Sequence, residues 1–287
     1  MPIDKSERLP MTHDPTAHYG VRETSSAVSE LDAHAEELRL IGCTVLPGEF
    51  DAGTIASLRK RITLLIERQE SEFGGRDALA RIGEEDTGRA LLAYDEAFLS
   101  LVANDRLLGL VERMLGPFFV LAQQNSVSLP SHQTHHQAQY HRDLPYQHFT
   151  SSRPLAISAL YCADAFTEEN GATWIIPGSH KFEPFPSTEA VQRLARPVTA
   201  PEGSFIVFDA MLFHRAGENR SDAIRRGVNH VFVLPFMRQQ IDLPAMLNGR
   251  FADDPRLRRL LGYESRTPMS VLDYRRERLD KLSKTKI

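Results

Sequence analysis

The chain is poor in the features that mark several broad classes of protein. Its 287 residues include only two cysteines, Cys43 and Cys162. Two cysteines make no disulfide framework and fit a reducing, cytoplasmic compartment. No apolar run approaches the ~20 residues that a membrane helix needs, and residues 1–20 lack the charged-then-apolar order of a secretion signal. No Gly-rich phosphate loop follows a predicted strand, which counts against a nucleotide-binding fold.

Neither positive nor negative charge predominates in the chain. The formal net charge is −4, hydrophobic residues make up 41 % of the chain and charged residues 25 %. This balance allows a packed core and gives no sign of a surface for nucleic acid or membrane. We therefore expect a soluble intracellular domain of enzyme size, either α/β or rich in β-strands.

Hydrophobic periodicity divides the chain into three parts after a polar arm, residues 1–27, that we expect to be flexible. Residues 28–116 read as a helical lead-in, with helices from about 29–41, 51–65, 95–104 and 106–115. Residues 117–240 read as short strands separated by turns. Residues 241–287 return to helix, with starts predicted at Asp254-Pro255 and at Ser270. Together, residues 28–287 are expected to form a single domain.

The strand patterns of the middle part suggest its architecture. Short strands are predicted at 44–46, 118–129, 155–162, 173–176, 204–208 and 227–235. Helices that flank a block of strands favour a mainly β fold, a β-sandwich or jelly roll braced by helices, over a repeating βαβ unit.

One constellation carries most of the chemical information. His141 and Asp143 are two residues apart, so on an extended backbone their side chains point to the same side. His214 follows an apolar strand far along the chain, and strands distant in sequence can be neighbours in a jelly roll. Two imidazoles and one carboxylate are good ligands for Fe(II) and leave positions open for a co-substrate and O2. A zinc enzyme could use the same set, although such sites more often hold a tetrahedral ion.

Other histidines compete for this role. His132, His135, His136 and His148 surround the pair in sequence. Because no carboxylate is interleaved among the first three, we interpret that segment as a polar loop at the mouth of the site. His180 follows the Pro177-Gly178 turn, and we expect it to be structural.

Several motifs resemble the phytanoyl-CoA dioxygenase family of Fe(II)/2-oxoglutarate oxygenases. They are His141-Arg142-Asp143-Leu144, Glu169-Asn170-Gly171-Ala172, Ile176-Pro177-Gly178-Ser179-His180-Lys181, Gly203-Ser204 before an apolar strand, and His214 with Arg225 eleven residues later. They extend from about Gln124 to Phe236.

The resemblance implies a double-stranded β-helix (a cupin-like jelly roll) with iron held by His141, Asp143 and His214. It also implies that Arg225, and not the adjacent Arg226, binds the distal carboxylate of 2-oxoglutarate, which suits a planar guanidinium. Gln124 or Asn125 is the corresponding candidate for a polar contact to the co-substrate. The family typically has small polar residues soon after the distal histidine, whereas this chain has Arg215-Ala216-Gly217.

The implied activity is hydroxylation of an unactivated C–H bond, with 2-oxoglutarate and O2 consumed and succinate and CO2 released. Desaturation, cyclisation or epimerisation at the same site, and a non-catalytic cupin-like module that binds metal or ligand, are the alternatives. Halogenation is disfavoured, because related halogenases replace the carboxylate that Asp143 keeps. Candidate substrate contacts are Tyr146, His148, Trp174 and Arg215, with Tyr140, Phe149, Arg142, Arg153 and Arg226 nearby, and the arginines admit an anionic substrate. The charged tail helix either covers the mouth, forms a dimer contact or is simply solvated.

Overall fold

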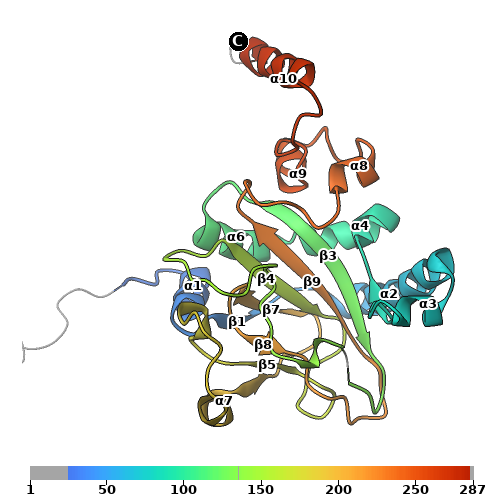
Figure 1. Ribbon diagram of the computed structural model, residues 1–287, viewed down its shortest axis with the longest axis vertical. Coiled ribbons are helices and arrows are strands. Elements are labelled where there is room, and N and C mark those ends of the chain that lie inside the picture. Colours follow the sequence, from blue (N-terminus) through green and yellow to red (C-terminus); the bar gives the residue numbers. More distant parts are fainter. Residues whose placement is uncertain (1–24, 135, 285–287) are drawn as a thin grey trace, which may run out of the picture.

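Two antiparallel sheets face each other in the computed structural model, which describes residues 25–134 and 136–284 (Figure 1). The larger sheet has six strands in the order β1-β7-β4-β9-β3-β2, and the smaller has three in the order β6-β5-β8. The strands of the larger sheet are β1 (Cys43–Pro47), β7 (Ser204–Asp209), β4 (Ala156–Cys162), β9 (Arg225–Val233), β3 (Val120–Leu129) and β2 (Thr87–Gly88). Those of the smaller sheet are β6 (Arg196–Val198), β5 (Thr173–Ile175) and β8 (His214–Arg215).

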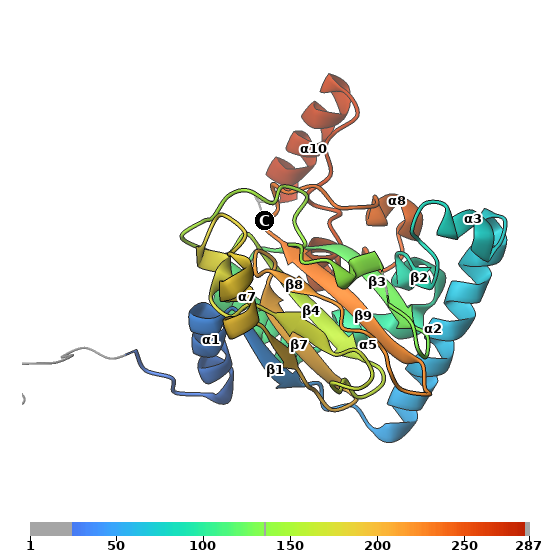
Figure 2. The same cartoon turned by 60° about the horizontal axis from the view of Figure 1, so that its bottom comes forward.

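Helices cover the outer face of the larger sheet (Figure 2). The lead-in helices are α1 (Glu30–Ile41), α2 (Ala52–Phe73), α3 (Arg76–Ala80), α4 (Leu91–Tyr94), η1 (Glu96–Phe98), α5 (Leu99–Val102) and α6 (Asp105–Leu115). Short helices η2 (His136–Ala138), η3 (Ser179–Lys181) and α7 (Thr188–Leu194) lie between strands. The tail holds α8 (Leu243–Leu247), α9 (Pro255–Leu260) and α10 (Val271–Lys284).

Strand alternation sorts the core into two layers. On β7, Phe205 and Val207 pack with the helices, whereas Ile206 and Phe208 pack into the space between the sheets. A period of two places successive side chains on opposite faces, so one strand serves both layers. The space between the sheets is therefore lined by a defined set of side chains, and the candidate site lies there.

Local sequence explains several helix boundaries. Ser29 accepts a hydrogen bond from Asp32 N at the start of α1, and Gly42, with φ 90°, ends it. The Asp254 side chain caps α9, and the Ser270 hydroxyl accepts from Asp273 N at the start of α10. The predicted helix starts in the tail are thus confirmed.

The sequence predictions of strands are confirmed within a few residues, and the double-sheet architecture agrees with the expected jelly roll. The helix predicted at 95–104 is shorter, because it forms a 3-10 turn, η1, followed directly by α5, and Asn104 caps the next helix, α6. Helix α7 was not predicted. Most of the expected flexible arm, residues 1–24, lies outside the described residues.

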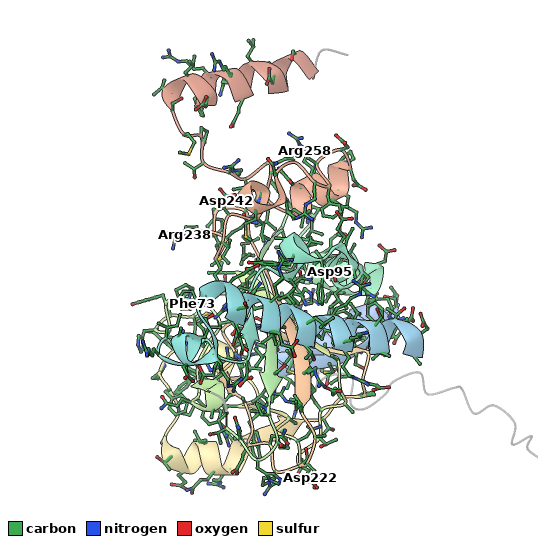
Figure 3. All side chains as sticks on the ribbon, turned by 90° about the vertical axis from the view of Figure 1, so that its right-hand side faces the viewer. Phe73, Asp95, Asp222, Arg238, Asp242 and Arg258 are labelled. Carbon is green, nitrogen blue, oxygen red and sulfur yellow. The ribbon has the colours of Figure 1, made fainter. Side chains whose placement is uncertain are left out.

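The last helix, α10, projects from the body of the molecule beyond α8 and α9 (Figures 1 and 3). Its leucines at 272, 279 and 282 are exposed. Within the described part of the chain, no helix has both the length and the apolar character that a membrane crossing demands.

Candidate metal centre

Three side chains from two segments of the chain converge between the sheets. His141 and His214 are paired through both backbone hydrogen bonds, His141 N to His214 O at 2.9 Å and His214 N to His141 O at 3.0 Å. Asp143 Oδ1 lies 3.8 Å from His141 Nε2 and 3.4 Å from His214 Nε2. One ligand atom from each residue lies within 4.8 Å of the others, which suits a single metal ion. The structure thus brings together the predicted triad.

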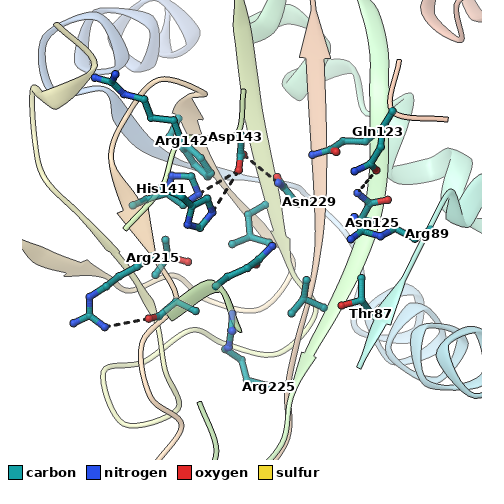
Figure 4. Close-up of a pocket in the computed structure, with 18 residues that line it drawn as sticks. Thr87, Arg89, Gln123, Asn125, His141, Arg142, Asp143, Arg215, Arg225 and Asn229 are labelled. Atoms are coloured by element: carbon teal, nitrogen blue, oxygen red, sulfur yellow. Dashed lines mark hydrogen bonds and ion pairs between the residues drawn. The ribbon is translucent and has the colours of Figure 1, made fainter. Parts of the chain in front are cut away.

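Neighbouring groups orient each of these ligands. The Nδ1 atoms of His141 and His214 lie 2.9 and 3.0 Å from the carbonyl oxygens of Gln139 and Leu212. This contact fixes the proton on Nδ1 and directs each Nε2 toward the shared centre. Asp143 Oδ2 accepts hydrogen bonds from Ser158 Oγ and Asn229 Nδ2, so Oδ1 is the oxygen that faces the imidazoles (Figure 4).

The electrostatics of the centre favour a charged carboxylate. Burial acts to raise the pKa of Asp143, but the His214 and His141 imidazoles and the Ser158 hydroxyl hold it well below its usual value. Asp143 is therefore ionised at neutral pH and presents the anionic ligand that a divalent cation needs.

A cavity of about 250 Å³ opens beside the triad. Arg225, the first residue of β9, reaches into it (Figure 4). The side chain is buried over the Phe166 ring, with Cζ 4.2 Å from the centroid, and its Nε atom has no hydrogen-bond partner among the described residues. Burial lowers the pKa of Arg225 to about 10, so the guanidinium is still charged at neutral pH. A buried cation with an unused donor is prepared for an anion.

Alternation along β9 separates Arg225 from its neighbour. Arg226 points to the opposite face, where its Nη1 atom lies 3.1 Å from Asp164 Oδ2 and Nε donates to Thr63 Oγ1. Asn229 shares the face of Arg225, and His230 shares that of Arg226. The structure thus separates the two arginines that the sequence placed side by side.

The same alternation decides between Gln124 and Asn125 on β3. The Gln124 side chain accepts from Leu92 N and donates to Phe98 O, on the helix side of the sheet. Asn125 lines the cavity, where its amide lies 2.9 Å from the Gln240 amide. The structure therefore places Gln124 away from the cavity and leaves Asn125 as the candidate for a polar contact.

Arg142, between the two ligands, has a structural role that the sequence did not indicate. Its guanidinium is buried, with Cζ 3.9 Å from the Phe213 ring centroid. It donates to six backbone carbonyls, those of Gln147, Phe149, Ser179, Phe182, Glu183 and Met211. Arg142 thus joins three loops around the metal ligands, and backbone carbonyls take up its donors.

The predicted substrate residues fall into two groups. Arg215 lines the cavity, and Trp174 and Tyr140 contact its guanidinium. Tyr146 is 62 % exposed and stacks on Phe149, with His148 beside it, on the loop after Asp143 and outside the cavity lining. Arg153 is exposed. The cavity as described therefore brings Arg215, but not Tyr146 or His148, to the site.

The remaining histidines are accounted for separately. His132 is exposed and lies 2.9 Å from Asp222, in the polar loop predicted at the mouth. His135 lies outside the described residues. His180 is buried, with Nε2 3.2 Å from Arg39 O, which agrees with the structural role expected of it.

Two groups that orient the site, Ser158 and Asn229, were missed in the sequence. Each lies in an apolar strand, and a polar residue on the strand face that points toward the site is the sequence feature that could have identified it. Asn219 was also missed: it is fully buried and donates to the carbonyls of Leu129, Pro130 and Ala223, which holds the loop that leads to Arg225.

Comparisons with known proteins identify the family. The sequence model of the phytanoyl-CoA dioxygenase family matches residues 38–227. The uncharacterized protein Rv1501 of Mycobacterium tuberculosis is 32 % identical over 253 residues, which cover 86 % of this chain and 92 % of that protein. Dioxygenase cdmD of Talaromyces verruculosus is 27 % identical over 71 % of this chain and 73 % of its own.

Solved structures share the fold. HygX from Streptomyces hygroscopicus, with nickel and 2-oxoglutarate bound, has a TM-score of 0.56 at 18 % identity and covers 76 % of this chain and 92 % of its own. The epimerase SnoN, in complex with Fe3+, alpha ketoglutarate and nogalamycin RO, has a TM-score of 0.55 at 20 % identity and covers 74 % and 87 %. These similarities confirm the jelly roll. The chain belongs to the phytanoyl-CoA dioxygenase family and is an Fe(II)- and 2-oxoglutarate-dependent enzyme.

Proposed function

We propose that this dioxygenase hydroxylates an unactivated C–H bond of a small molecule, with His141, Asp143 and His214 as the iron ligands and Arg225 as the receptor for 2-oxoglutarate. The observation that carries the proposal is the orientation of the three side chains. The outer atoms of all three side chains are bound to neighbouring groups, while Nε2, Nε2 and Oδ1 face one another.

The donor set fits Fe(II) better than the alternatives. Two neutral imidazoles and one carboxylate form the facial arrangement that leaves open positions on an octahedral ion. A structural zinc site would close its coordination with a fourth protein ligand, and the metal-ligating cluster found in the described residues has three members.

The surroundings of Arg225 fit a carboxylate in the same way. A buried guanidinium is costly unless it is paired. Asp164, the carboxylate that acts to raise its pKa, does so through charge alone and is not hydrogen-bonded to it. A dicarboxylate that reaches from the metal to Arg225 would supply the missing partner, and Asn125 is placed to add a polar contact.

Iron and 2-oxoglutarate, when bound, supply oxygen activation with release of succinate and CO2. The chain contributes binding, orientation and exclusion of water. Phe208 and Leu160 line the cavity as apolar walls, and Phe208 lies 4.6 Å from the His214 ring. Ser158 and Asn229 hold the Asp143 carboxylate in one orientation, so the ligand geometry is set before the metal binds.

The first test is anaerobic titration with Fe(II) and 2-oxoglutarate, read as a visible charge-transfer band. We expect the band in the wild type and none in Asp143→Ala or His214→Ala. The control is His132→Ala, which removes the exposed histidine that pairs with Asp222 and should keep the band. A band of full intensity in both triad variants would refute the metal assignment.

The second test separates the two adjacent arginines. Arg225→Gln should weaken 2-oxoglutarate binding at least ~30-fold, since losing a buried charged partner costs about 2 kcal/mol or more. Arg226→Gln removes the same charge from the opposite face and should leave that affinity within about twofold. Equal effects of the two variants would contradict the assigned role of Arg225.

The reaction outcome is read from the product mass. Hydroxylation adds one oxygen atom, desaturation or cyclisation removes two hydrogens, and epimerisation leaves the mass unchanged. A screen of candidate metabolites by 2-oxoglutarate consumption, coupled to product mass, distinguishes these outcomes.

We also propose that the enzyme acts in the cytoplasm on a small-molecule substrate with an anionic group, and that residues 28–287 form one catalytic domain. Cys43 and Cys162 are both unpaired and buried, which suits a reducing compartment. The helices of the lead-in and the larger sheet share one hydrophobic core, which supports a single domain.

A further inference from the structure

Arg215 occupies an unusual position at the cavity wall. It follows the ligand His214 directly on β8 and pairs with Trp174 of β5. Its guanidinium carbon lies 5.2 Å from the Trp174 ring centroid and 5.3 Å from that of Tyr140. Two aromatic rings thus hold the cation in place, and Figure 4 shows it on the same side of the cavity as His141.

The hydrogen-bonding capacity of Arg215 is largely unused. Within the described residues its one hydrogen bond is from Nη1 to Ala216 O, at 3.2 Å, and it forms no ion pair. A guanidinium carries five N–H donors in a planar fork. Arg89, which also lines the cavity, is different, because Glu84 pairs with both its Nε and its Nη2 atoms. Arg215 is therefore half-buried, oriented and without a counter-charge.

The charges around the cavity indicate which charge the substrate should carry. A divalent metal, the Asp143 carboxylate and the Arg225 cation together carry two positive charges, and the 2-oxoglutarate dianion offsets them. Arg89 is offset by Glu84. Arg142, which also lines the cavity, gives its donors to backbone carbonyls. Once 2-oxoglutarate occupies Arg225, Arg215 is the cavity cation within the described residues whose donors are free for a negatively charged group of the substrate.

The opposite wall of the cavity is polar. Thr87, Gln123, Asn125 and Gln240 line it, and Figure 4 shows the labelled residues of this group across the strands from the triad. Amide and hydroxyl groups on a cavity wall form hydrogen bonds with a polar substrate but not with an alkyl chain. This wall therefore favours a hydrophilic substrate over a long-chain acyl or terpenoid one.

We propose that the substrate is a hydrophilic carboxylic acid whose carboxylate binds Arg215 between Tyr140 and Trp174. The inference rests on the proposed function and deepens it, because it names the substrate class and the residue that selects it. Arg215 acts on substrate specificity, through a bidentate contact that fixes the acid next to the metal.

Trp174 provides a direct reporter, because it is the single tryptophan of the chain. The full-length protein is loaded anaerobically with Fe(II) and saturating 2-oxoglutarate, so that Arg225 is occupied. Tryptophan fluorescence is then titrated with N-acetylglycine and, separately, with N-acetylglycinamide, which has the same shape and no charge. We expect the acid to bind at least ~10-fold more tightly than the amide, as a charge-assisted hydrogen bond predicts.

Variants assign this preference to one side chain. Arg215→Gln should bring the two affinities within about twofold of each other. Arg220→Gln is the matched control, since it removes an exposed arginine from the following loop and should keep the preference. Equal affinities in the wild type, a preference that survives in Arg215→Gln, or a preference lost equally in Arg220→Gln would each overturn the proposal.

The charge-transfer band of the same samples separates the two levels of inference. If the band forms and Trp174 reports no preference for the acid, the substrate class is wrong and the proposed function stands. If the band does not form, the proposed function fails and the substrate inference fails with it.

Discussion

Replacement of Arg142 by methionine tests whether one buried cation organises the loops around the metal. Methionine keeps an apolar stem over Phe213 and removes six hydrogen bonds to backbone carbonyls. At about 0.5–1.5 kcal/mol net for each bond, the loss would be about 3–9 kcal/mol. Relief of the cation's own desolvation offsets part of this, because no carboxylate of the described residues is hydrogen-bonded to it. We expect Arg142→Met to lower the free energy of unfolding by about 3 kcal/mol.

The assay is urea denaturation of the metal-free protein, with hydrogen exchange of residues 144–150 and 179–183 as the local measurement. Those amides should lose protection before the larger sheet does, since the bonds of Arg142 end on these loops. Arg153→Met is the control: this arginine is exposed, and its loss should change stability by less than ~0.5 kcal/mol. If Arg142→Met were as stable as this control, with unchanged exchange in both loops, the reasoning would be refuted.

Three further predictions concern buried groups. Burial lowers the pKa of His230 to about 4; because the unfolded chain takes up this proton near pH 6.5, stability should be fully present above that pH and fall by about 3 kcal/mol toward pH 4. Denaturation of wild type and His230→Gln across this range should show a shallower slope in the variant; parallel slopes would contradict the prediction. Burial raises the pKa of Cys43 to about 12 and that of Cys162 further. Neither thiol should therefore react with a thiol reagent at pH 8 until urea unfolds the chain. Rapid labelling of the native protein would show that the two thiols are not buried. Gly42→Ala should lower the free energy of unfolding by at least ~2 kcal/mol in urea denaturation, since φ is +90° and the new Cβ would lie 2.5 Å from His180 Nδ1. The control Gly83→Ala, with φ +66° and nothing within 4 Å of the new Cβ, should cost only the backbone strain. Equal costs in the two variants would argue against the contact with His180.

The parts of the site that sequence could predict are those fixed by local spacing. His141 and Asp143 share a face because they are two residues apart, and the turn motifs identify the family that supplies His214 and Arg225. The choice between Gln124 and Asn125 could not be made in this way. It depends on the register of β3, which shifts between Leu121 and Gln123, and a shift of one residue exchanges the two faces of a strand.

Long-range contacts account for what the sequence did not show. Arg142 looks like a charged residue beside the site, yet it binds carbonyls more than 30 positions away on two other loops. The segment 95–104 has helical periodicity, but its helix begins as the 3-10 turn η1 and ends at Val102, and Asn104 then caps α6. Such outcomes are decided by tertiary packing, which a single segment does not encode.

The antiparallel bridge between His141 and His214 adds His141 to the edge of the smaller sheet, at β8. Asp143 is anchored to β4 and β9 of the larger sheet through Ser158 and Asn229, whereas His214 belongs to the smaller one. An ion held by all three would crosslink the two halves of the barrel. Loss of iron would then loosen the junction between the two sheets as well as stop turnover, and the iron-free form would be the one most open to proteolysis.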